Sequence, residues 1–448
     1  MVCKGLVGTL AFSISLHGLR KVTACVAAAL LSACGDAGSS LSPSAPGALA
    51  SQHGASGAQE PLSGFKSLHN FKGSPDGGTP YAGLVAENGA LYGTTWGGGT
   101  SGLGTVFEVS MSGKEHALHS FKGSLDGENP WGGLATMKGT LYGTTSGGGA
   151  GCSSSGGCGI VFKVGKTGES PLYSFKGPAQ NDGADPQYNN DLMAFNGLLY
   201  GMTDYGGSSK LNWGTVFEIN GSGTERVLHR FGKANDGANP AWGLIALDGM
   251  LYGTTTNGGT RNEGTVFEVS TSGKERVLYN FKGGADGAGP VGSLVALNGV
   301  LYGTTEGGGT GCVYLDGCGT IFAVSTSGKE RVLYRFSGAP DGVQPEAGLT
   351  KVAGRKDMLY GTTEEGGTAC TGSGSFSGCG TVFEVSTSGV ERILHSFHGY
   401  VDGAYPFGGL TVFDGTLFGT TSGGGSGGCA SNSGAGCGTV FRISPSSL

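Results

Sequence analysis

The sequence has little charge and almost no helical pattern. Charged residues make up only 13% of its 448 residues, and Lys and Arg form no cluster. The formal net charge is −6; the first 33 residues contain Lys4, Arg20 and Lys21 but no acid, so the rest of the chain carries −9. Binding to nucleic acid needs a basic surface that displaces counterions from phosphates, so we expect no nucleic-acid partner. Helical periodicity is almost absent after residue 35, which favours an all-β fold.

The usual sets of catalytic and cofactor-binding residues are also missing. We find no Ser-His-Asp order, no His-rich metal set and no unique cysteine nucleophile. The Gly-Gly-Gly runs lack the Lys-Ser/Thr that a phosphate-binding loop requires, which argues against a bound nucleotide. The sequence therefore predicts no cofactor and no metal, and it favours a binding protein over an enzyme.

Glycine is abundant, with 94 residues, and it recurs with a period. Three markers each occur seven times at spacings of 50 to 61 residues, which indicates seven structural repeats. The first marker is Leu-Tyr-Gly-Thr-Thr, with its aromatic residue at Tyr92, Tyr142, Tyr200, Tyr252, Tyr302, Tyr360 and Phe418. The second is Asp-Gly-x-x-Pro, beginning at Asp76, Asp126, Asp182, Asp236, Asp286, Asp341 and Asp402. The third resembles Gly-Thr-Val-Phe, beginning at Gly104, Gly159, Gly214, Gly264, Gly319, Gly380 and Gly438.

Each repeat predicts four short antiparallel strands. In the fifth repeat we expect them at 293–297, 300–305, 320–325 and 330–336, with a two-residue turn at Asn298-Gly299 that needs positive φ. The chain begins its repeats with a lone fourth strand at 65–71 and ends with a third strand at 439–444. Pairing these two would close a ring, so the sequence predicts a seven-bladed β-propeller spanning 65–448.

The N-terminus is typical of an exported lipoprotein. Arg20-Lys21 precede an apolar stretch too short to span a bilayer, which ends in Leu31-Ser32-Ala33-Cys34. This ending resembles the bacterial lipobox, so we expect residues 1–33 to be a signal peptide and Cys34 to be acylated. A Gly/Ser/Ala/Pro linker then runs to residue 64. The pattern predicts a chain anchored in the cell envelope, in the outer membrane, without indicating which side of it the propeller occupies.

Eight further cysteines form four close pairs, each within a glycine-rich loop. Zinc is the alternative to a disulfide in such loops, but these loops contain no histidine, so we expect disulfides, which fit an oxidising compartment. The pairs are Cys152/Cys158, Cys312/Cys318, Cys370/Cys379 and Cys429/Cys437.

These composite motifs, over residues 65–444, resemble the GloVer tandem repeat of the choice-of-anchor proteins. The resemblance implies export and anchoring, but it implies no established activity and no site. Within the repeat, the Asp-Gly-x-x-Pro elements could bind calcium, but sevenfold repetition favours a structural role in which Asp bonds amides two residues on. Histidines at 69, 119, 229 and 395 are expected to be packing residues.

Function is expected on the face of the propeller that carries the long loops, because variable loops on a rigid scaffold are common binding sites. Aromatic and amide side chains that break the repeat are typical of sugar-binding surfaces, although drift and packing between blades could also explain them. The candidate ligand-binding residues are Trp96, Trp131, Tyr188, Asn189, Asp204, Tyr205 and Trp242.

An acidic cluster on the same face offers a different hypothesis. Glu306, Glu364 and Glu365, with Asp316 and Glu346 nearby, could supply two carboxylates for glycoside hydrolysis, although solvated surface acids are commoner. The sequence thus predicts a monomeric lipoprotein that binds a glycan or a protein partner. The alternatives are a carbohydrate-active hydrolase or lyase and a scaffold for envelope assembly.

Overall fold

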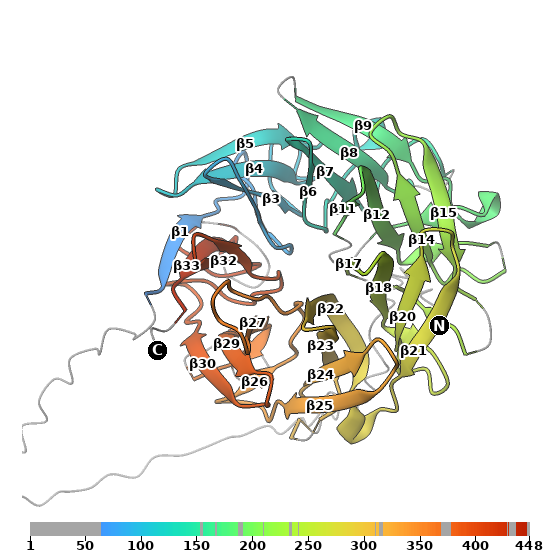
Figure 1. Cartoon of the computed structure of the whole chain (residues 1–448). Coiled ribbons are helices and arrows are strands. Elements are labelled where there is room, and N and C mark those ends of the chain that lie inside the picture. Colours follow the sequence, from blue (N-terminus) through green and yellow to red (C-terminus); the bar gives the residue numbers. More distant parts are fainter. Residues whose placement is uncertain are drawn as a thin grey trace, which may run out of the picture. The chain divides into compact units, whose positions relative to one another are not determined.

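Seven small antiparallel sheets follow one another around a ring, as Figure 1 shows. The computed structural model describes residues 64–152, 156–165, 168–186, 191–208, 210–232, 235–240, 242–309, 311–312, 317–368, 378–427, 429 and 436–445. All of them belong to one unit, Glu60–Leu448. The predicted seven-bladed propeller is confirmed, whereas the predicted signal peptide, Cys34 and most of the linker lie outside the described residues.

Blades 1 to 4 each contain four strands. Blade 1 comprises β2 (Val85–Glu87), β3 (Ala90–Thr95), β4 (Thr105–Ser110) and β5 (Glu115–Ser120). Blade 2 comprises β6 (Ala135–Met137), β7 (Thr140–Thr145), β8 (Ile160–Gly165) and β9 (Gly168–Ser174). Blade 3 comprises β11 (Met193–Phe195), β12 (Leu198–Thr203), β14 (Thr215–Ile219) and β15 (Glu225–Arg230). Blade 4 comprises β17 (Ile245–Leu247), β18 (Met250–Thr255), β20 (Thr265–Ser270) and β21 (Glu275–Asn280).

Blades 5 to 7 complete the ring. Blade 5 comprises β22 (Ala288–Leu297), β23 (Val300–Gly307), β24 (Thr320–Ser325) and β25 (Glu330–Arg335). Blade 6 comprises β27 (Met358–Thr363), β29 (Thr381–Ser386) and β30 (Glu391–Ser396), and an isolated bridge between Thr350 and Tyr360 takes the place of its first strand. Blade 7 comprises β31 (Thr411–Phe413), β32 (Thr416–Thr421), β33 (Thr439–Ile443) and β1 (Lys66–Asn70).

Short strands and 3₁₀ turns lie in the connections between blades and in the loops. Three two-stranded ribbons pair β10 (Gly183–Ala184) with β13 (Tyr205–Gly206), β16 (Gly237–Ala238) with β19 (Asn257–Gly258), and β26 (Gly342–Val343) with β28 (Glu365–Gly366). Three single turns of 3₁₀-helix are η1 (Ser124–Asp126), η2 (Pro178–Gln180) and η3 (Gly284–Asp286). No helix among the described residues is both long and apolar enough to cross a membrane.

The repeat motifs are explained by packing inside each blade. The Phe of Gly-Thr-Val-Phe is fully buried, as at Phe107, and it lies against the Gly of Leu-Tyr-Gly-Thr-Thr in the neighbouring strand. A Cβ atom on Gly93 would lie 2.6 Å from Cζ of Phe107. Because interiors are close-packed, only glycine leaves room for this ring. The predicted Asn298-Gly299 turn is also confirmed, with φ of 53° and 76°.

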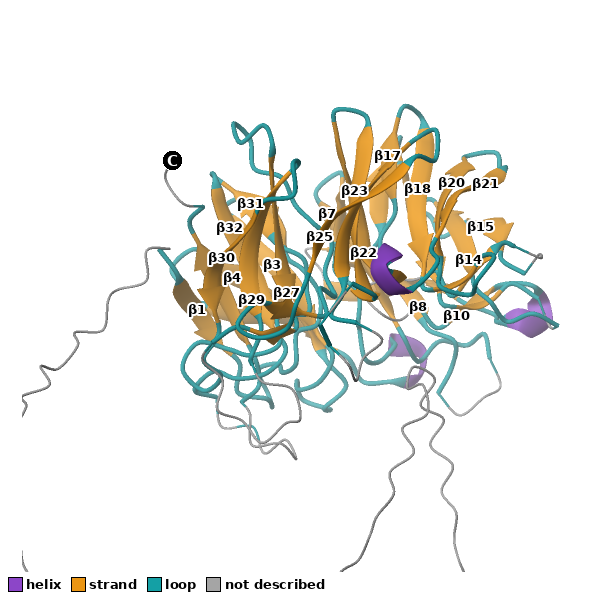
Figure 2. Ribbon diagram, turned by 90° about the horizontal axis from the view of Figure 1, so that it is seen from below, coloured by secondary structure: helices purple, strands orange, loops and turns teal. Residues whose placement is uncertain are grey.

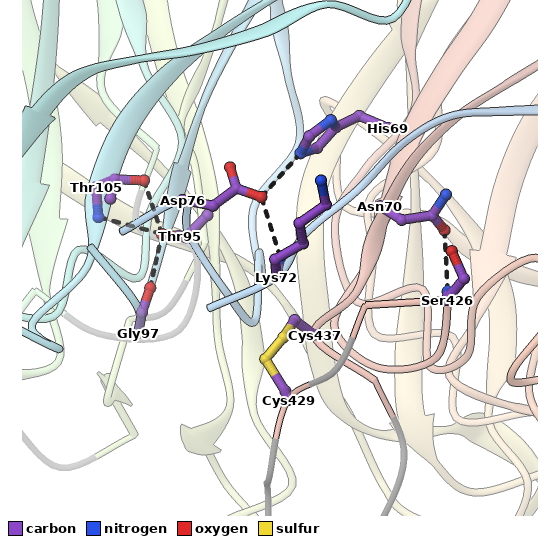
Figure 3. Close-up of polar contacts among 10 residues, drawn as sticks. All are labelled: His69, Asn70, Lys72, Asp76, Thr95, Gly97, Thr105, Ser426, Cys429 and Cys437. Carbon is purple, nitrogen blue, oxygen red and sulfur yellow. Dashed lines mark hydrogen bonds and ion pairs between the residues drawn. A yellow bond between two sulfur atoms is a disulfide. The ribbon is translucent and has the colours of Figure 1, made fainter. Parts of the chain in front are cut away.

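The two threonines of the motif make different hydrogen bonds. The second threonine stays within its blade: the Thr95 hydroxyl lies 2.9 Å from that of Thr105 and donates to the Gly97 carbonyl at 2.8 Å (Figure 3). The first threonine connects blades, since the Thr94 hydroxyl donates to the Gly132 carbonyl of the next blade at 2.9 Å. Buried hydroxyls thus hold neighbouring blades in register.

The two ends of the propeller close the ring as predicted. Strand β1 pairs antiparallel with β33 in blade 7, with Lys66 opposite Arg442 and Asn70 opposite Thr439. Across the next boundary, the Thr420 hydroxyl donates to the Ala82 carbonyl of blade 1 at 2.8 Å, a contact between residues 338 positions apart. No blade is left with an unpaired outer strand at this closure.

The two faces of the ring differ in their loops. Figure 2 shows short hairpins along one edge and longer loops along the other. The longer loops connect the second and third strands of each blade, and the Asp-Gly-x-x-Pro connections emerge beside them; we call this side the loop face. Disulfides fix three of its loops, as predicted for Cys152–Cys158, Cys312–Cys318 and Cys429–Cys437 (the last in Figure 3). Cys379 is also disulfide-bonded, but its predicted partner Cys370 lies outside the described residues.

Candidate functional site

Three of the predicted ligand-binding residues meet in one aromatic group on the loop face. Trp96 directly follows β3, whereas Tyr81, Trp131 and Phe407 each follow the proline of an Asp-Gly-x-x-Pro connection. Tyr81 stacks on Trp131, with ring centroids 4.5 Å apart and planes 4° apart. Trp96 packs edge-on against Trp131 at 6.1 Å. Phe407 packs edge-on against Tyr81 at 5.3 Å and continues the group to Trp242, whose ring lies 5.9 Å away. We call these five residues the aromatic platform.

The exposure of the side chains decreases along the platform from Trp96 to Trp242. Trp96 keeps 38% of its surface exposed, Tyr81 and Trp131 are partly buried, and Trp242 is only 4% exposed. Trp213 is just as exposed as Trp96, at 39%, but it makes no ring contact with another described aromatic residue. The predicted candidates Trp96 and Trp131 thus belong to the platform, whereas Trp213 does not.

Acidic side chains lie beside the platform. Glu346 is 7% exposed, and burial together with the charges of Glu306 and Glu364 raises its pKa well above the usual range. Burial, with Glu365 and Glu306, raises the pKa of Glu364 to about 7. Glu364 in turn contributes to the raised pKa of Tyr81, after burial. The predicted acidic cluster therefore exists and adjoins the aromatic platform, whereas Asp316 lies outside the described residues.

The acidic cluster can hold a proton at neutral pH. Buried carboxyl groups that share a site do not all ionise, because each charge disfavours the next. Burial also raises the pKa of Glu365. Burial raises the pKa of Tyr405 as well, and the charges of Glu365 and Glu364 raise it further. A protonated carboxyl beside an ionised one can donate and accept hydrogen bonds to hydroxyl groups at the same time.

The described candidates in blade 3 lie at its junctions with the neighbouring blades. Asp204 is 3% exposed, and burial and the charge of Asp185 raise its pKa to about 7. Its backbone carbonyl accepts a hydrogen bond from the Asn239 side chain at 3.2 Å. Tyr205 packs against the hydrophobic cluster between blades 2 and 3. Tyr188 and Asn189 lie outside the described residues.

The Asp-Gly-x-x-Pro aspartates have a structural role, but a different one from that predicted. Asp76 accepts a hydrogen bond from the Lys72 amide, four residues earlier, rather than from an amide two residues on, and its carboxylate lies 3.2 Å from Nε2 of His69 (Figure 3). The prediction that the histidines only pack is incomplete as well. His69 and its equivalents contact the aspartate directly, and tyrosines at the equivalent places donate to it instead, as Tyr279 does to Asp286 at 2.7 Å.

At six of the seven junctions a glutamate from the next blade lies beside this contact. The His69–Asp76 pair lies beside Glu115 of blade 1, and the ligand atoms of all three lie within 4.8 Å of one another. Two similar groups are His119, Asp126 and Glu169, and His229, Asp236 and Glu275. Tyrosine replaces histidine at three other junctions without loss of the aspartate contact. The constant feature is thus a hydrogen bond from the outer strand of a blade to the aspartate of the connection that follows it, rather than a set of metal ligands.

Sequence reasoning missed the contributions of Tyr81 and Phe407. Both occupy the position after the proline, where the other repeats carry Trp131, Gln187, Ala241, Val291 and Glu346. Aligning the repeats at this position would have shown three aromatic residues at a place that the fold leaves free to vary.

Comparison with known proteins places the chain in a family. No curated protein matches the sequence significantly. Among solved structures, it resembles a gluconolactonase of Xanthomonas campestris at 12% identity, covering 85% of this chain and 99% of that one, with a TM-score of 0.40. It also resembles an α-L-arabinofuranosidase of Fusarium graminearum at 14% identity, covering 68% of this chain and 90% of that one, with a TM-score of 0.42. Such values support no inference about activity.

The family assignment comes from the sequence. The profile of the Gloeobacter/Verrucomicrobia repeat matches residues 52–210 and 150–373, which together cover most of the chain. The matched segments contain the repeats whose motifs build the first blades of the propeller. The chain therefore belongs to the Gloeobacter/Verrucomicrobia repeat family.

Proposed function

We propose that this protein is an exported, lipid-anchored, monomeric propeller that binds a glycan on its loop face. The observation that carries the proposal is the stacked pair Tyr81 and Trp131 with the exposed Trp96 beside it. Sugar rings present apolar faces that stack on aromatic side chains, and carboxyl groups nearby bind the hydroxyls. Glu364, next to Tyr81, supplies such a group.

The location in the envelope is part of the same proposal. It is supported by the lipobox-like sequence that ends at Cys34 and by disulfides in the loops of the propeller, which fit an oxidising compartment. Acylation of Cys34 would hold the propeller at a membrane, the outer membrane in this proposal, through the linker that ends at residue 64. Mass spectrometry of the protein from its native membrane tests this, because a diacylated N-terminal Cys34 is the expected species.

Glycan binding is tested with an array of envelope and plant polysaccharides, using the purified, oxidised protein with and without Ca²⁺. We expect selective binding that falls by at least about tenfold in Trp96→Ala and Trp131→Ala, a loss of roughly 1.4 kcal/mol or more. Trp213→Ala is the matched control, because Trp213 is equally exposed but lies outside the platform. Equal loss in all three variants, or no loss in any, would contradict the proposal. A blank array would favour a protein partner, which cross-linking in intact cells would identify.

A second candidate function is cleavage of a glycosidic bond by the acidic cluster, either by hydrolysis or by the elimination that lyases catalyse. The specific observation in its favour is that Glu346, buried and with a raised pKa, lies beside Glu306 and Glu364 next to the platform. A protonated acid paired with an ionised carboxylate is the arrangement that glycosidases use. Turnover of a polysaccharide bound on the array, abolished in Glu346→Gln and in Glu364→Gln with Glu365→Gln, would establish this function. Binding without release of reducing ends would exclude it for that ligand.

A further inference from the structure

One residue from each blade lines the axis of the propeller. It is the residue before the leucine that begins the inner part of each blade: Gly83, Gly133, Asp191, Gly243, Ser293, Gly348 and Gly409. Neighbours in this axial ring lie so close that a Cβ on Gly83 would be 2.8 Å from the Gly409 carbonyl oxygen, and one on Gly348 would be 2.3 Å from that of Ser293. Glycine at positions 83 and 348 therefore lets the blades approach each other this closely at the axis.

The axial ring surrounds a cavity of about 160 Å³. Besides ring residues, its lining contains Trp242, Thr350, Thr411 and the leucines that follow four of the ring residues. A water molecule needs about 10–15 Å³ of such a volume, so the cavity has room for on the order of ten waters. This room is comparable to the size of one sugar ring and too small for two. Trp242 also belongs to the aromatic platform, so the platform is continuous with the wall of the cavity.

The three lining residues that depart from the repeat are in consecutive blades. Asp191 replaces glycine in blade 3, Trp242 replaces a small residue in blade 4, and Ser293 replaces glycine in blade 5. Asp191 Oδ1 accepts a hydrogen bond from the Gly133 amide at 2.6 Å, and Ser293 Oγ accepts one from the Gly243 amide at 2.9 Å. Asp191 and Ser293 flank Gly243, whose Cβ would lie 3.3 Å and 3.5 Å from their Cβ atoms. Each polar group is thus held at the axis by the amide of the preceding blade.

The fold does not need these departures, and one of them is costly. Trp242 has φ of 78°, in the left-handed region that a bulky residue rarely adopts, where the other described blades carry Ala82, Gly132, Gly292, Ala347 and Gly408. Its buried indole N–H has no hydrogen-bond partner. Backbone strain of this kind is unfavourable, and so is an unpaired buried donor. Such costs concentrated at one residue in a cavity wall point to a ligand-binding role.

We infer that the axial cavity binds a single sugar unit at the end of a glycan chain, whose following units lie on the aromatic platform. This rests on the proposed function and deepens it, because it specifies recognition of a chain end rather than of the middle of a chain. The Asp191 carboxylate accepts hydrogen bonds from ring hydroxyls, the Ser293 hydroxyl donates to a ring oxygen, and Trp242 offers its face to the apolar side of the ring. The closed ring of blades leaves no room for a chain to pass sideways through this position.

The test uses free monosaccharides as probes, namely glucose, galactose, mannose, xylose, arabinose and N-acetylglucosamine, at about 10 mM, where millimolar affinities are visible. Saturation-transfer NMR is measured on the full protein, and each sugar is also tested as a competitor for any glycan found on the array. We expect at least one sugar to bind and to compete, and its binding to fall by at least tenfold in Asp191→Gly and in Ser293→Gly.

These variants restore the residue that five blades already carry, so they preserve the fold, and thermal melting confirms this. Asp357→Asn is the control and leaves binding unchanged, because Asp357 lies in the turn directly before β27, on the side of the ring opposite the loop face. If no sugar binds at 10 mM, or if Asp191→Gly and Ser293→Gly bind like the wild type, the inference is wrong. Loss of polysaccharide binding in Trp96→Ala with no effect of Asp191→Gly refutes the axial subsite alone. Sugar binding that needs Asp191 but not Trp96 refutes the platform and retains the cavity.

Discussion

Carboxyl pairs between blades make the stability of this propeller depend on pH. At six of the seven junctions a glutamate from one blade lies beside the Asp-Gly-x-x-Pro aspartate that follows the preceding blade. Burial, together with the neighbouring aspartate, raises the pKa of Glu115, Glu225 and Glu391 to about 7 and that of Glu169 to about 8. The folded chain thus keeps protons on these groups at a pH where the unfolded chain has lost them.

The sign and size of the effect follow from these values. A glutamate whose pKa rises on folding stabilises the protein fully below its unfolded pKa, about 4.5, and this contribution disappears as pH rises through 7 to 8. A shift from 4.5 to about 7 corresponds to roughly 3 kcal/mol, which we reduce to about 1 kcal/mol per site because these side chains are only partly buried. Four sites then give about 4 kcal/mol between pH 4.5 and 8.5, equivalent to a fall in Tm of roughly 5 °C for a domain of this size.

Scanning calorimetry from pH 5 to pH 8.5 measures this fall directly. Glu169→Gln replaces the one of these groups whose pKa is raised most, and whose side chain is 2% exposed, with a neutral residue of the same shape. It should raise Tm by about 1 °C at pH 8.5 and change it little at pH 5, because only the charged form is unfavourable. Glu87→Gln in β2, away from any junction, is the control. A Tm that stays constant over this range, or curves for Glu169→Gln and wild type that fall in parallel, would refute the reasoning.

Three further predictions test how the blades are held together, each by equilibrium unfolding in guanidinium chloride. Thr420→Val removes the hydrogen bond to the Ala82 carbonyl that joins blades 7 and 1 and should cost about 1–2 kcal/mol, whereas Thr144→Val should cost less, because the Thr144 hydroxyl has no partner to lose. Gly93→Ala places a methyl group 2.6 Å from Cζ of Phe107 and should cost about 1–3 kcal/mol. Reducing Cys429–Cys437 should cost about 2 kcal/mol and leave the ring folded, because the bond closes only a short loop; equal stability with and without reductant would show that the loop is already constrained.

The sequence predicted most of the fold because the information is local and repeated. The Asn298-Gly299 turn, the four strands of blade 5 and the disulfide Cys312–Cys318 each depend on residues close together in the chain. Each was confirmed, apart from the start of β22, which lies at Ala288 rather than 293. Repetition strengthened these predictions, since the same motif occurs in seven independent copies.

Contacts between blades could not be predicted in the same way. The approach of Glu115 to the His69–Asp76 pair was not predicted, because Glu115 lies in the next blade and the motifs give no sign of this contact. The aromatic platform combines Tyr81 of blade 1 with Phe407 of blade 7, which are far apart in the sequence. Predicting such contacts requires the angle and distance between neighbouring sheets, which hydrophobic pattern does not contain.

The places where the repeat is broken share one region of the ring. Between blades 2 and 3 the Thr144 hydroxyl lacks the partner that Thr94 has in Gly132, and between blades 3 and 4 Met202 replaces the threonine altogether. Each missing hydrogen bond forgoes about 1 kcal/mol of stability. Asp191 and Trp242, which line the axial cavity, belong to blades 3 and 4, which meet at these boundaries. Local rules of a fold are usually broken at functional sites, where binding requires what stability alone would not select. The coincidence of lost interblade bonds with polar and strained residues on the axis therefore favours the axial cavity, with the platform at its edge, as the part of this propeller shaped for a ligand.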